Sequence, residues 1–386
     1  FQPIKVLKGD FSKSKESAPL RKGLVVFQFM VCAALILFLF IVSNQVTYMA
    51  NKELGFQAEQ ILVIPMQTED LKNNFVAAKN ELQSLPGIEG ISLANNLPGQ
   101  MMGGNSYQIR DKQQVLDFNR VDEDFLDVLD IPLLQGRFFT KQDQLDSAAS
   151  YVVNESFLKF FGIEEDPIGQ QVIGGNGNGP IIGVVKDFHW QGFEQAIEPF
   201  VMQEFRAYLP QVIMRLKSEN IQETIQQIKT KWAVFEPKHP MRYSFLDEDF
   251  GALYKSHENF SKALNLITLL IIFTAAMGLF GLAAFIAEQR SKEIGIRKVL
   301  GASISQIMYM MIKDFVKLVI VAGFIAMPLG YWIAQQWLVD FAYRTTIGLT
   351  PFAGSLFIIL FIAVLTVSYQ ALRASTANPV QAIKSE

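Results

Sequence analysis

The stretch EQRSKEIGIRKVLGAS, residues 288–303, is polar and basic and stands between two long apolar runs. The run before it ends at Ala287, and the charge-free run after it begins at Leu318. Lysine and arginine resist transfer across a bilayer, so a basic segment between uncharged runs is typical of a loop that stays on the cytoplasmic side of a membrane. This stretch therefore predicts a membrane protein.

The composition of the chain agrees with that prediction. Half of its 386 residues are hydrophobic and only 18% are charged, which is too apolar for an ordinary soluble domain. The formal net charge of −3 gives no basis for a nucleic-acid partner. The single cysteine, Cys32, excludes a disulfide framework and a cysteine metal site.

Four stretches without charge are long enough to cross about 30 Å of hydrocarbon. They are Gly23–Asn51, Ala263–Ala287, Leu318–Val339 and Thr345–Leu372. A core helix of a soluble protein is the alternative, but such a helix normally has a polar face. The first stretch exceeds a signal-peptide core and lacks a convincing cleavage site, so we expect a retained helix.

The distribution of lysine and arginine predicts the orientation. Cations precede the first helix and separate the second helix from the third, at Lys5, Lys8, Lys13, Lys15, Arg21, Lys22, Arg290, Lys292, Arg297, Lys298 and Lys313. Both termini are therefore expected in the cytoplasm, and the segment 52–259 outside it.

That outer segment contains two similar strand-helix-strand units. The first has a strand at 61–66 and a helix with apolar residues at Leu71, Phe75, Ala78, Leu82 and Leu85; the second has a strand at 211–217 and a helix with Ile221, Ile225, Ile228, Trp232 and Phe235. We predict an α-helical membrane protein with a large extracytoplasmic α/β domain, split by a β-rich insert. Chance similarity is the alternative, because any amphipathic helix shows this spacing.

The search for an active site gives a negative result. The acidic run Asp122, Glu123, Asp124, Asp127 and Asp130 lacks the spacing of a calcium loop, and we expect a capped, solvated helix start there. His189, His239 and His257 are scattered and show no zinc-binding spacing. Neither a GxSxG elbow nor a GxxxxGK[ST] loop occurs. We predict no catalytic residue, no metal site and no cofactor on this chain.

Residues 290–303 are amphipathic if they form one helix. Ile296, Val299, Leu300 and Ser303 would lie on one face, opposite Arg290, Arg297 and Lys298. Such an element would lie on lipid headgroups or dock into a groove of another protein, while a passive positive-inside loop is the alternative.

The chain resembles the FtsX-like, MacB-like class of ABC transporter permeases in three features. These are the block at 288–303, the closing ANPVQAIKSE, and the order of its parts: one helix, a large outer domain and then three helices. GPIIGVVKDFHWQGFEQAIEPF (179–200) and WLVDFAYRTTIGL (337–349) are similar to variants common in Bacteroidetes-type permeases. The resemblance implies a non-catalytic permease subunit of the cell inner (cytoplasmic) membrane, partnered by an ABC ATPase dimer on separate chains that binds ATP and Mg²⁺.

In that family the cytoplasmic block couples the permease to the ATPase. The resemblance assigns this role here to Glu288, Arg290, Lys292, Glu293, Gly295, Arg297, Lys298 and Gly301. ATP hydrolysis would then drive a shape change of the periplasmic domain, a mechanism called mechanotransmission, and export or release a substrate. A membrane sensor that binds a ligand outside and signals through an associated ATPase or kinase is the alternative function.

These expectations divide the chain into nine segments. A cytoplasmic segment (1–22) precedes the first transmembrane helix (23–51) and the periplasmic core domain (52–259), which has a porter-like part (58–97 and 206–250) and a sabre-like insert (98–205). Three further transmembrane helices (260–287, 314–339 and 351–373) enclose the coupling segment (288–313) and a short periplasmic loop (340–350), and a cytoplasmic tail (374–386) follows.

A second permease half is a further expected partner. FQPIKVLK at 1–8 echoes NPVQAIK at 378–384, and we hypothesise that the chain is the second half of a tandem permease; otherwise it would form a homodimer. Small residues on one side of the second transmembrane helix are suited to close helix packing: Thr274, Gly278, Gly281 and Ala284. The lipid bilayer and a periplasmic partner protein complete the implied partners.

Overall fold

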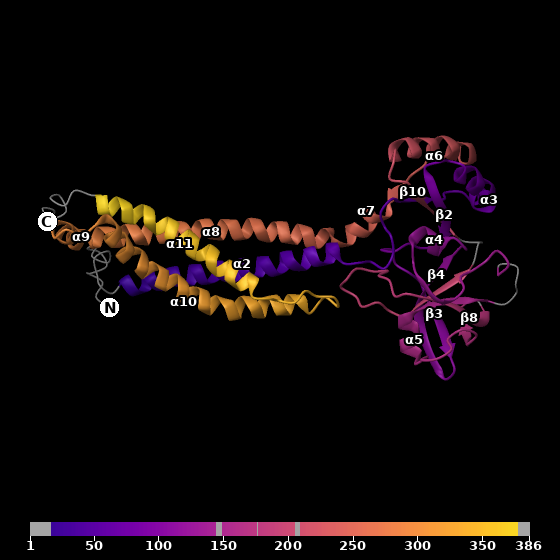
Figure 1. Cartoon of the computed structure of the whole chain (residues 1–386), viewed down its shortest axis with the longest axis horizontal. Coiled ribbons are helices and arrows are strands. Elements are labelled where there is room, and N and C mark those ends of the chain that lie inside the picture. Colours follow the sequence, from indigo (N-terminus) through magenta and orange to yellow (C-terminus); the bar gives the residue numbers. More distant parts are fainter. Residues whose placement is uncertain (1–16, 144–148, 176, 205–208, 377–386) are drawn as a thin grey trace, which may run out of the picture. The chain divides into compact units, whose positions relative to one another are not determined.

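The computed structural model describes residues 17–143, 149–175, 177–204 and 209–376 (Figure 1). The echo between residues 1–8 and 378–384 lies outside the described residues. The chain divides into two compact units. A helical unit comprises the described residues before 51 together with 257–340 and 344 onward, and an α/β unit comprises 51–256 and Phe341–Tyr343.

The helical unit contains four helices that are long and apolar enough to cross a membrane, which confirms the predicted fold class. They are α2 (Ser17–Asn51), α8 (Lys255–Gln289), α10 (Ile304–Leu338) and α11 (Thr350–Thr376). A short helix, α9 (Ser291–Val299), joins α8 to α10. Pro328 lies inside α10, whose helical assignment continues on both sides of it.

Helix α2 is the centre of the helical unit. In its most apolar part 56% of the residues are buried, against 22% to 28% in the corresponding parts of the other three membrane-spanning helices. One buried cluster joins all four helices, and Phe29, Leu279, Val319 and Ile359 are members from α2, α8, α10 and α11. The other three helices therefore carry most of the apolar surface that faces outward, as expected of helices in contact with lipid.

The α/β unit is built on the two strand-helix-strand segments. Strands β1 (Ile61–Pro65), β2 (Ile88–Ala94), β10 (Gln211–Leu216) and β11 (Ser244–Phe245) lie in the order β11-β1-β10-β2, with antiparallel neighbours. Strand β10 thus lies between β1 and β2. The two strand-helix-strand segments therefore interlock in one sheet, which confirms the split α/β domain.

The helices of these segments, α3 (Glu69–Gln83) and α6 (Ile221–Phe235), pack on this sheet. Their apolar stripes enter one core, where Phe75 and Trp232 are almost fully buried. Glu236, 4% exposed, accepts hydrogen bonds from Thr68 at the start of α3 and from the Trp232 indole. This buried carboxylate links the beginning of one helix to the end of the other. After β11, α7 (Leu246–Gly251) and the 3₁₀ turn Ala252–Tyr254 lead into α8.

The insert between β2 and β10 is β-rich, as predicted. It contains β3 (Gly104–Ile109), β4 (Lys112–Val121), α4 (Phe125–Leu129), β5 (Leu133–Gly136), β6 (Tyr151–Asn154), α5 (Glu155–Phe161), β7 (Gln171–Gly174), β8 (Gly177–Val185) and β9 (Phe200–Glu204). Six of its strands pair in the order β4-β3-β7-β8-β6-β9. The parallel pairing of β9 with β4 closes this order into a ring. Closure of the ring leaves no free edge among these six strands.

The acidic run at 122–130 differs from the prediction of a solvated helix start. Asp122 is 2% exposed, and its carboxylate lies 3.0 Å from the Lys79 ammonium of α3. Ser92 donates a second hydrogen bond to it, and Lys79 also pairs with Asp124. Asp124 precedes α4 but makes no side-chain capping bond. The prediction was wrong for Asp122 because a lysine from a distant helix reaches it.

Candidate functional site

The basic block folds as a helix, a turn and a second helix start. Helix α9 ends at Val299, and Gly301 has a φ of +90°, in the region that favours glycine. Ser303 then caps α10: its hydroxyl accepts from the Gln306 N–H, and the Gln306 side chain accepts from the Ser303 N–H. Residues 290–303 therefore do not form one helix, and Ser303 does not belong to α9, because Gly301 and this capping box divide the segment.

One face of α9 is anchored within the helical unit. Ile294 is 4% exposed and belongs to a buried cluster with Ala287 of α8, Ile307 and Met311 of α10, and Ala371 of α11. Gly295 is also buried. Figure 1 places α9 where α8 and α11 end and α10 begins. The helix is thus held by the ends of three membrane-spanning helices.

The opposite face of α9 is apolar and exposed. Ile296, Val299 and Leu300 are 54%, 67% and 80% exposed. These residues are the predicted apolar face, and they make no core contact within the described chain. Contiguous exposed apolar side chains on a helix of this kind mark an interaction surface.

The charged residues of the block form ion pairs and a hydrogen bond along the sides of α9. Arg290 pairs with Asp314 of α10 at 3.0 Å, and Arg297 pairs with Glu293 one turn earlier at 2.7 Å. The Lys298 ammonium donates to the Ser375 carbonyl at 2.8 Å, near the C-terminus of α11, where the helix dipole favours a cation. Because the two ion pairs are partly exposed, each contributes about 1 kcal/mol at most, and their main effect is to orient α9.

A hollow of about 350 Å³ lies beside α9 in the helical unit. Glu288, Ser291 and Lys298 line it together with Gln370 and Arg373 of α11. The sequence reasoning missed Gln370 and Arg373, because they lie some seventy positions after the block and only the packing of α11 against α9 brings them there. Arg373 in the last turn of the final apolar run was the available signal.

The predicted residues are thus distributed around α9. Gly295, Arg290, Glu293, Arg297 and Lys298 lie at or within the helix, whereas Glu288 lies at the end of α8 and Gly301 in the following turn. Lys292 is exposed.

The predicted small-residue stripe on α8 has two environments. The space beside Gly278 is occupied by the Gln28 side chain of α2, whose Oε1 would lie 2.5 Å from an added Cβ. Gly281 has open space around it, and Thr274 is exposed. Ala284 is half-buried and lines the hollow beside α9. A groove of about 330 Å³ runs between α2 and α8 along Gly278 and Gly281.

Comparison with known proteins identifies the class. Residues 29–231 match the model of the MacB-like periplasmic core domain, and residues 265–379 match that of the FtsX-like permease C-terminal domain. The first match alone covers more than half of the chain. The chain therefore belongs to the MacB/FtsX-type family of ABC transporter permeases.

Curated relatives agree with this assignment. The probable syringafactin export ATP-binding/permease protein SyfD of Pseudomonas syringae pv. tomato is 25% identical over 72% of this chain and 44% of its own length. The macrolide export ATP-binding/permease protein MacB 2 of Aeromonas hydrophila is 26% identical over 66% of this chain and 40% of its own length. The uncharacterized ABC transporter permease YknZ of Bacillus subtilis is 21% identical over 85% of both. The chain spans about half the length or less of the first relatives, whose names combine ATP-binding and permease parts.

Among solved structures, the chain is similar to the periplasmic region of MacB from Actinobacillus actinomycetemcomitans. The two are 16% identical, the match covers 53% of this chain and 95% of that one, and the TM-score is 0.38. The extracellular domain of YknZ is 14% identical and covers 48% of this chain and 98% of that one, with a TM-score of 0.36.

Proposed function

We propose that this permease couples ATP hydrolysis by a separate ABC ATPase to a conformational change of its α/β unit, and so drives export or release of a substrate. The ATPase dimer binds ATP and Mg²⁺, and this chain supplies the surface that receives the movement. The exposed apolar face of α9, formed by Ile296, Val299 and Leu300, is the observation that carries this proposal.

Two properties of α9 support the role of a coupling element. Its outer face offers three apolar side chains for a groove on a partner, and the flanking Lys292 and Arg297 offer charge at the rim of the contact. Its inner face is fixed by Ile294 to α8, α10 and α11. A force applied to α9 is therefore passed to three membrane-spanning helices, because a close-packed contact is not compressible.

The proposed orientation follows from the charges of the short segments. The positive charges of Arg290, Lys292, Arg297 and Lys298 support a cytoplasmic position for α9 and for both termini. In this proposal the helical unit spans the inner membrane of the cell, and the α/β unit is periplasmic. In this proposal 288–313 is the coupling segment, the split α/β part (58–97 and 206–250) is porter-like, and the insert (98–205) is sabre-like. A periplasmic partner protein is a further proposed contact of that unit.

We also propose that a second permease half packs along the groove between α2 and α8. Gly278 and Gly281 line this groove without side-chain bulk, and Thr274 lies one turn before Gly278 on α8. A close approach of helices needs such small residues. The Gln28 Oε1 atom at this groove is buried and has no hydrogen-bond partner among the described residues. A polar group on the second half would supply that partner.

Site-specific photocrosslinking in native membranes tests the docking surface. A photoreactive amino acid at position 300 is expected to crosslink to a protein that carries an ABC ATPase signature, identified by mass spectrometry. The same probe at Val234, which is 75% exposed on the α/β unit, is the matched control and should not capture it. Equal capture at both positions, or none at 300, contradicts the proposal.

A further inference from the structure

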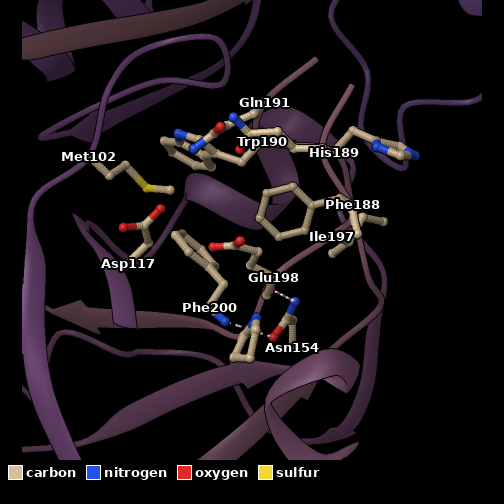
Figure 2. A pocket seen from close by; sticks show the side chains of 13 residues that line it. Met102, Asp117, Asn154, Phe188, His189, Trp190, Gln191, Ile197, Glu198 and Phe200 are labelled. Atoms are coloured by element: carbon tan, nitrogen blue, oxygen red, sulfur yellow. Dashed lines mark hydrogen bonds between the residues drawn. The ribbon is translucent and has the colours of Figure 1, made fainter. Parts of the chain in front are cut away.

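A small pocket opens in the α/β unit where strands β4 and β9 run side by side (Figure 2). Asp117 and Phe200 are direct partners in the parallel pairing of these strands. Glu198 lies two residues before Phe200, just ahead of β9, and also lines the pocket. Figure 2 shows the carboxylates of Asp117 and Glu198 on the two sides of the Phe200 ring.

Buried aromatic rings form the wall of the pocket. Trp190 stacks on Phe200 with 5.1 Å between ring centroids, and the Phe188 ring meets Phe200 edge-on at 5.5 Å. All three residues are buried, with at most 7% of their surface exposed, and Met102 also lines the pocket. The aromatic wall is therefore in place before any ligand arrives.

Hydrogen bonds hold the segment that carries Glu198. Asn154, 1% exposed, accepts from the Phe200 N–H at 2.9 Å and donates to the Glu198 carbonyl at 3.0 Å. The Trp190 indole N–H donates to the Gln100 carbonyl at 3.1 Å. These bonds hold the backbone at Glu198 and Phe200, and they orient the Trp190 ring.

Among the described residues, the charge of the pocket is not compensated by its lining. Two carboxylates line it, and none of the described residues that line it is lysine or arginine. Burial, together with the charge of Glu198, raises the pKa of the Asp117 carboxyl. A cation in the pocket would remove this repulsion and would also lie against aromatic faces, which attract cations.

From this geometry we propose that the pocket binds a primary alkylammonium group, carried by a lysine side chain of a peptide or by a polyamine. The ammonium has three N–H donors for the carboxylates and nearby carbonyls. The pocket has a volume of about 30 Å³, which is room for a group of about the size of water rather than for a drug-sized molecule.

A divalent metal ion fits this pocket less well. Calcium takes six to eight oxygen ligands, and the described chain holds no group of three or more His, Cys, Asp and Glu side chains suited to a metal. The aromatic wall also offers no metal ligand. An ammonium ion uses both parts of the pocket, the carboxylates and the rings.

Isothermal titration of the purified full chain in detergent, without nucleotide or ATPase, tests the proposal. The probes are Nα-acetyl-lysine amide and spermidine, and Nα,Nε-diacetyl-lysine amide is the matched neutral compound. We expect saturable binding of the first two and at least about tenfold weaker binding of the neutral compound. The tighter of the first two identifies the source of the ammonium group.

The variants Asp117→Asn and Glu198→Gln are each expected to weaken binding about tenfold or more. Glu165→Gln, an exposed acid of the same unit outside the pocket, should leave it unchanged. Glu198 is exposed, so its variant retains the fold even if Asp117→Asn does not. Equal binding of the neutral compound, or wild-type affinity in Glu198→Gln, overturns the proposal. Because the assay needs no ATPase, failure here is distinct from failure of the proposed coupling.

Discussion

The ammonium of Lys52 lies 3.7 Å from the centroid of the Tyr343 ring, within the α/β unit. Lys52 follows α2, whereas Tyr343 belongs to the short connection between α10 and α11. The Tyr343 N–H donates to the Phe193 carbonyl at 3.2 Å, and the Ala342 N–H donates to the Glu194 carbonyl at 3.0 Å. Three residues from a connection between membrane-spanning helices are therefore built into the α/β unit.

The Tyr343 hydroxyl accepts a hydrogen bond from the Ile197 N–H at 3.4 Å, and Ile197 lines the pocket of the α/β unit. Tyr343→Phe removes this acceptor and keeps the ring. We expect amide exchange at Ile197 to become about fivefold faster, since such a bond contributes about 1 kcal/mol. Hydrogen exchange with mass spectrometry measures this. Unchanged exchange at 193–198 would show that the hydroxyl does not hold the rim.

Acidification is expected to weaken the contacts around His189. The centroid of its ring lies 4.8 Å from that of the Tyr343 ring. Burial and the nearby Lys52 charge lower the pKa of His189 to about 4, while the charge of Asp187 acts in the opposite direction. The unfolded chain, with a histidine pKa of about 6.5, binds the proton first as the pH falls. Stability from this group is therefore complete above about pH 6.5 and is lost as the pH falls toward 4, by on the order of 3 kcal/mol.

Hydrogen exchange of the α/β unit at pH 7 and pH 5 checks this dependence. His189→Gln removes the titrating group, so the variant should lose less protection than the wild type over this interval. Other carboxyl groups titrate equally in both proteins, and the difference between them isolates His189. An identical loss in both proteins would contradict the assignment.

The fold was predictable where periodicity is strong. Leu71, Phe75, Ile225 and Trp232 recur at helical spacing, and each enters the predicted core. The pocket was not predictable, because Asp117 and Phe200 meet only through a parallel pairing of strands far apart in the sequence. The exposed face of α9 was predicted from the spacing of its apolar residues. The C-terminal end of α9 was not predicted, because the effect of Gly301 depends on a backbone angle.

The buried pair of Lys79 and Asp122 should contribute far more than an exposed pair of the same chemistry. Lys79→Met leaves the buried Asp122 carboxylate without its cation, and we expect a loss of about 3 kcal/mol in the free energy of unfolding of the α/β unit. Lys231→Met breaks the more exposed pair with Glu81 and should change the free energy of unfolding far less. Thermal unfolding of the full chain in detergent compares the two variants. Equal losses would show that the Ser92 hydroxyl and the Asp124 backbone N–H, which both donate to Asp122, compensate the buried charge without the lysine.

The turn after α9 is expected to require glycine. Gly301 has a φ of +90° and no atom within 4 Å of an added Cβ, so Gly301→Ala is strained by its backbone alone, at a cost of about 1 kcal/mol. The turn would relax and shift the exposed Leu300 that precedes it. Under the proposed coupling, we expect the reconstituted complex with its ATPase to hydrolyse ATP at about one-fifth of the wild-type rate.

Gly251→Ala is the matched control for this substitution. Gly251 also has no atom within 4 Å of an added Cβ, but its φ is −60°, which alanine adopts without strain. This variant should keep the wild-type ATPase rate. The decisive case is a complex with Gly301→Ala that hydrolyses ATP as fast as the complex with Gly251→Ala, although hydrogen exchange shows that the turn after α9 has changed. In that case the geometry of α9 does not transmit the movement of the ATPase.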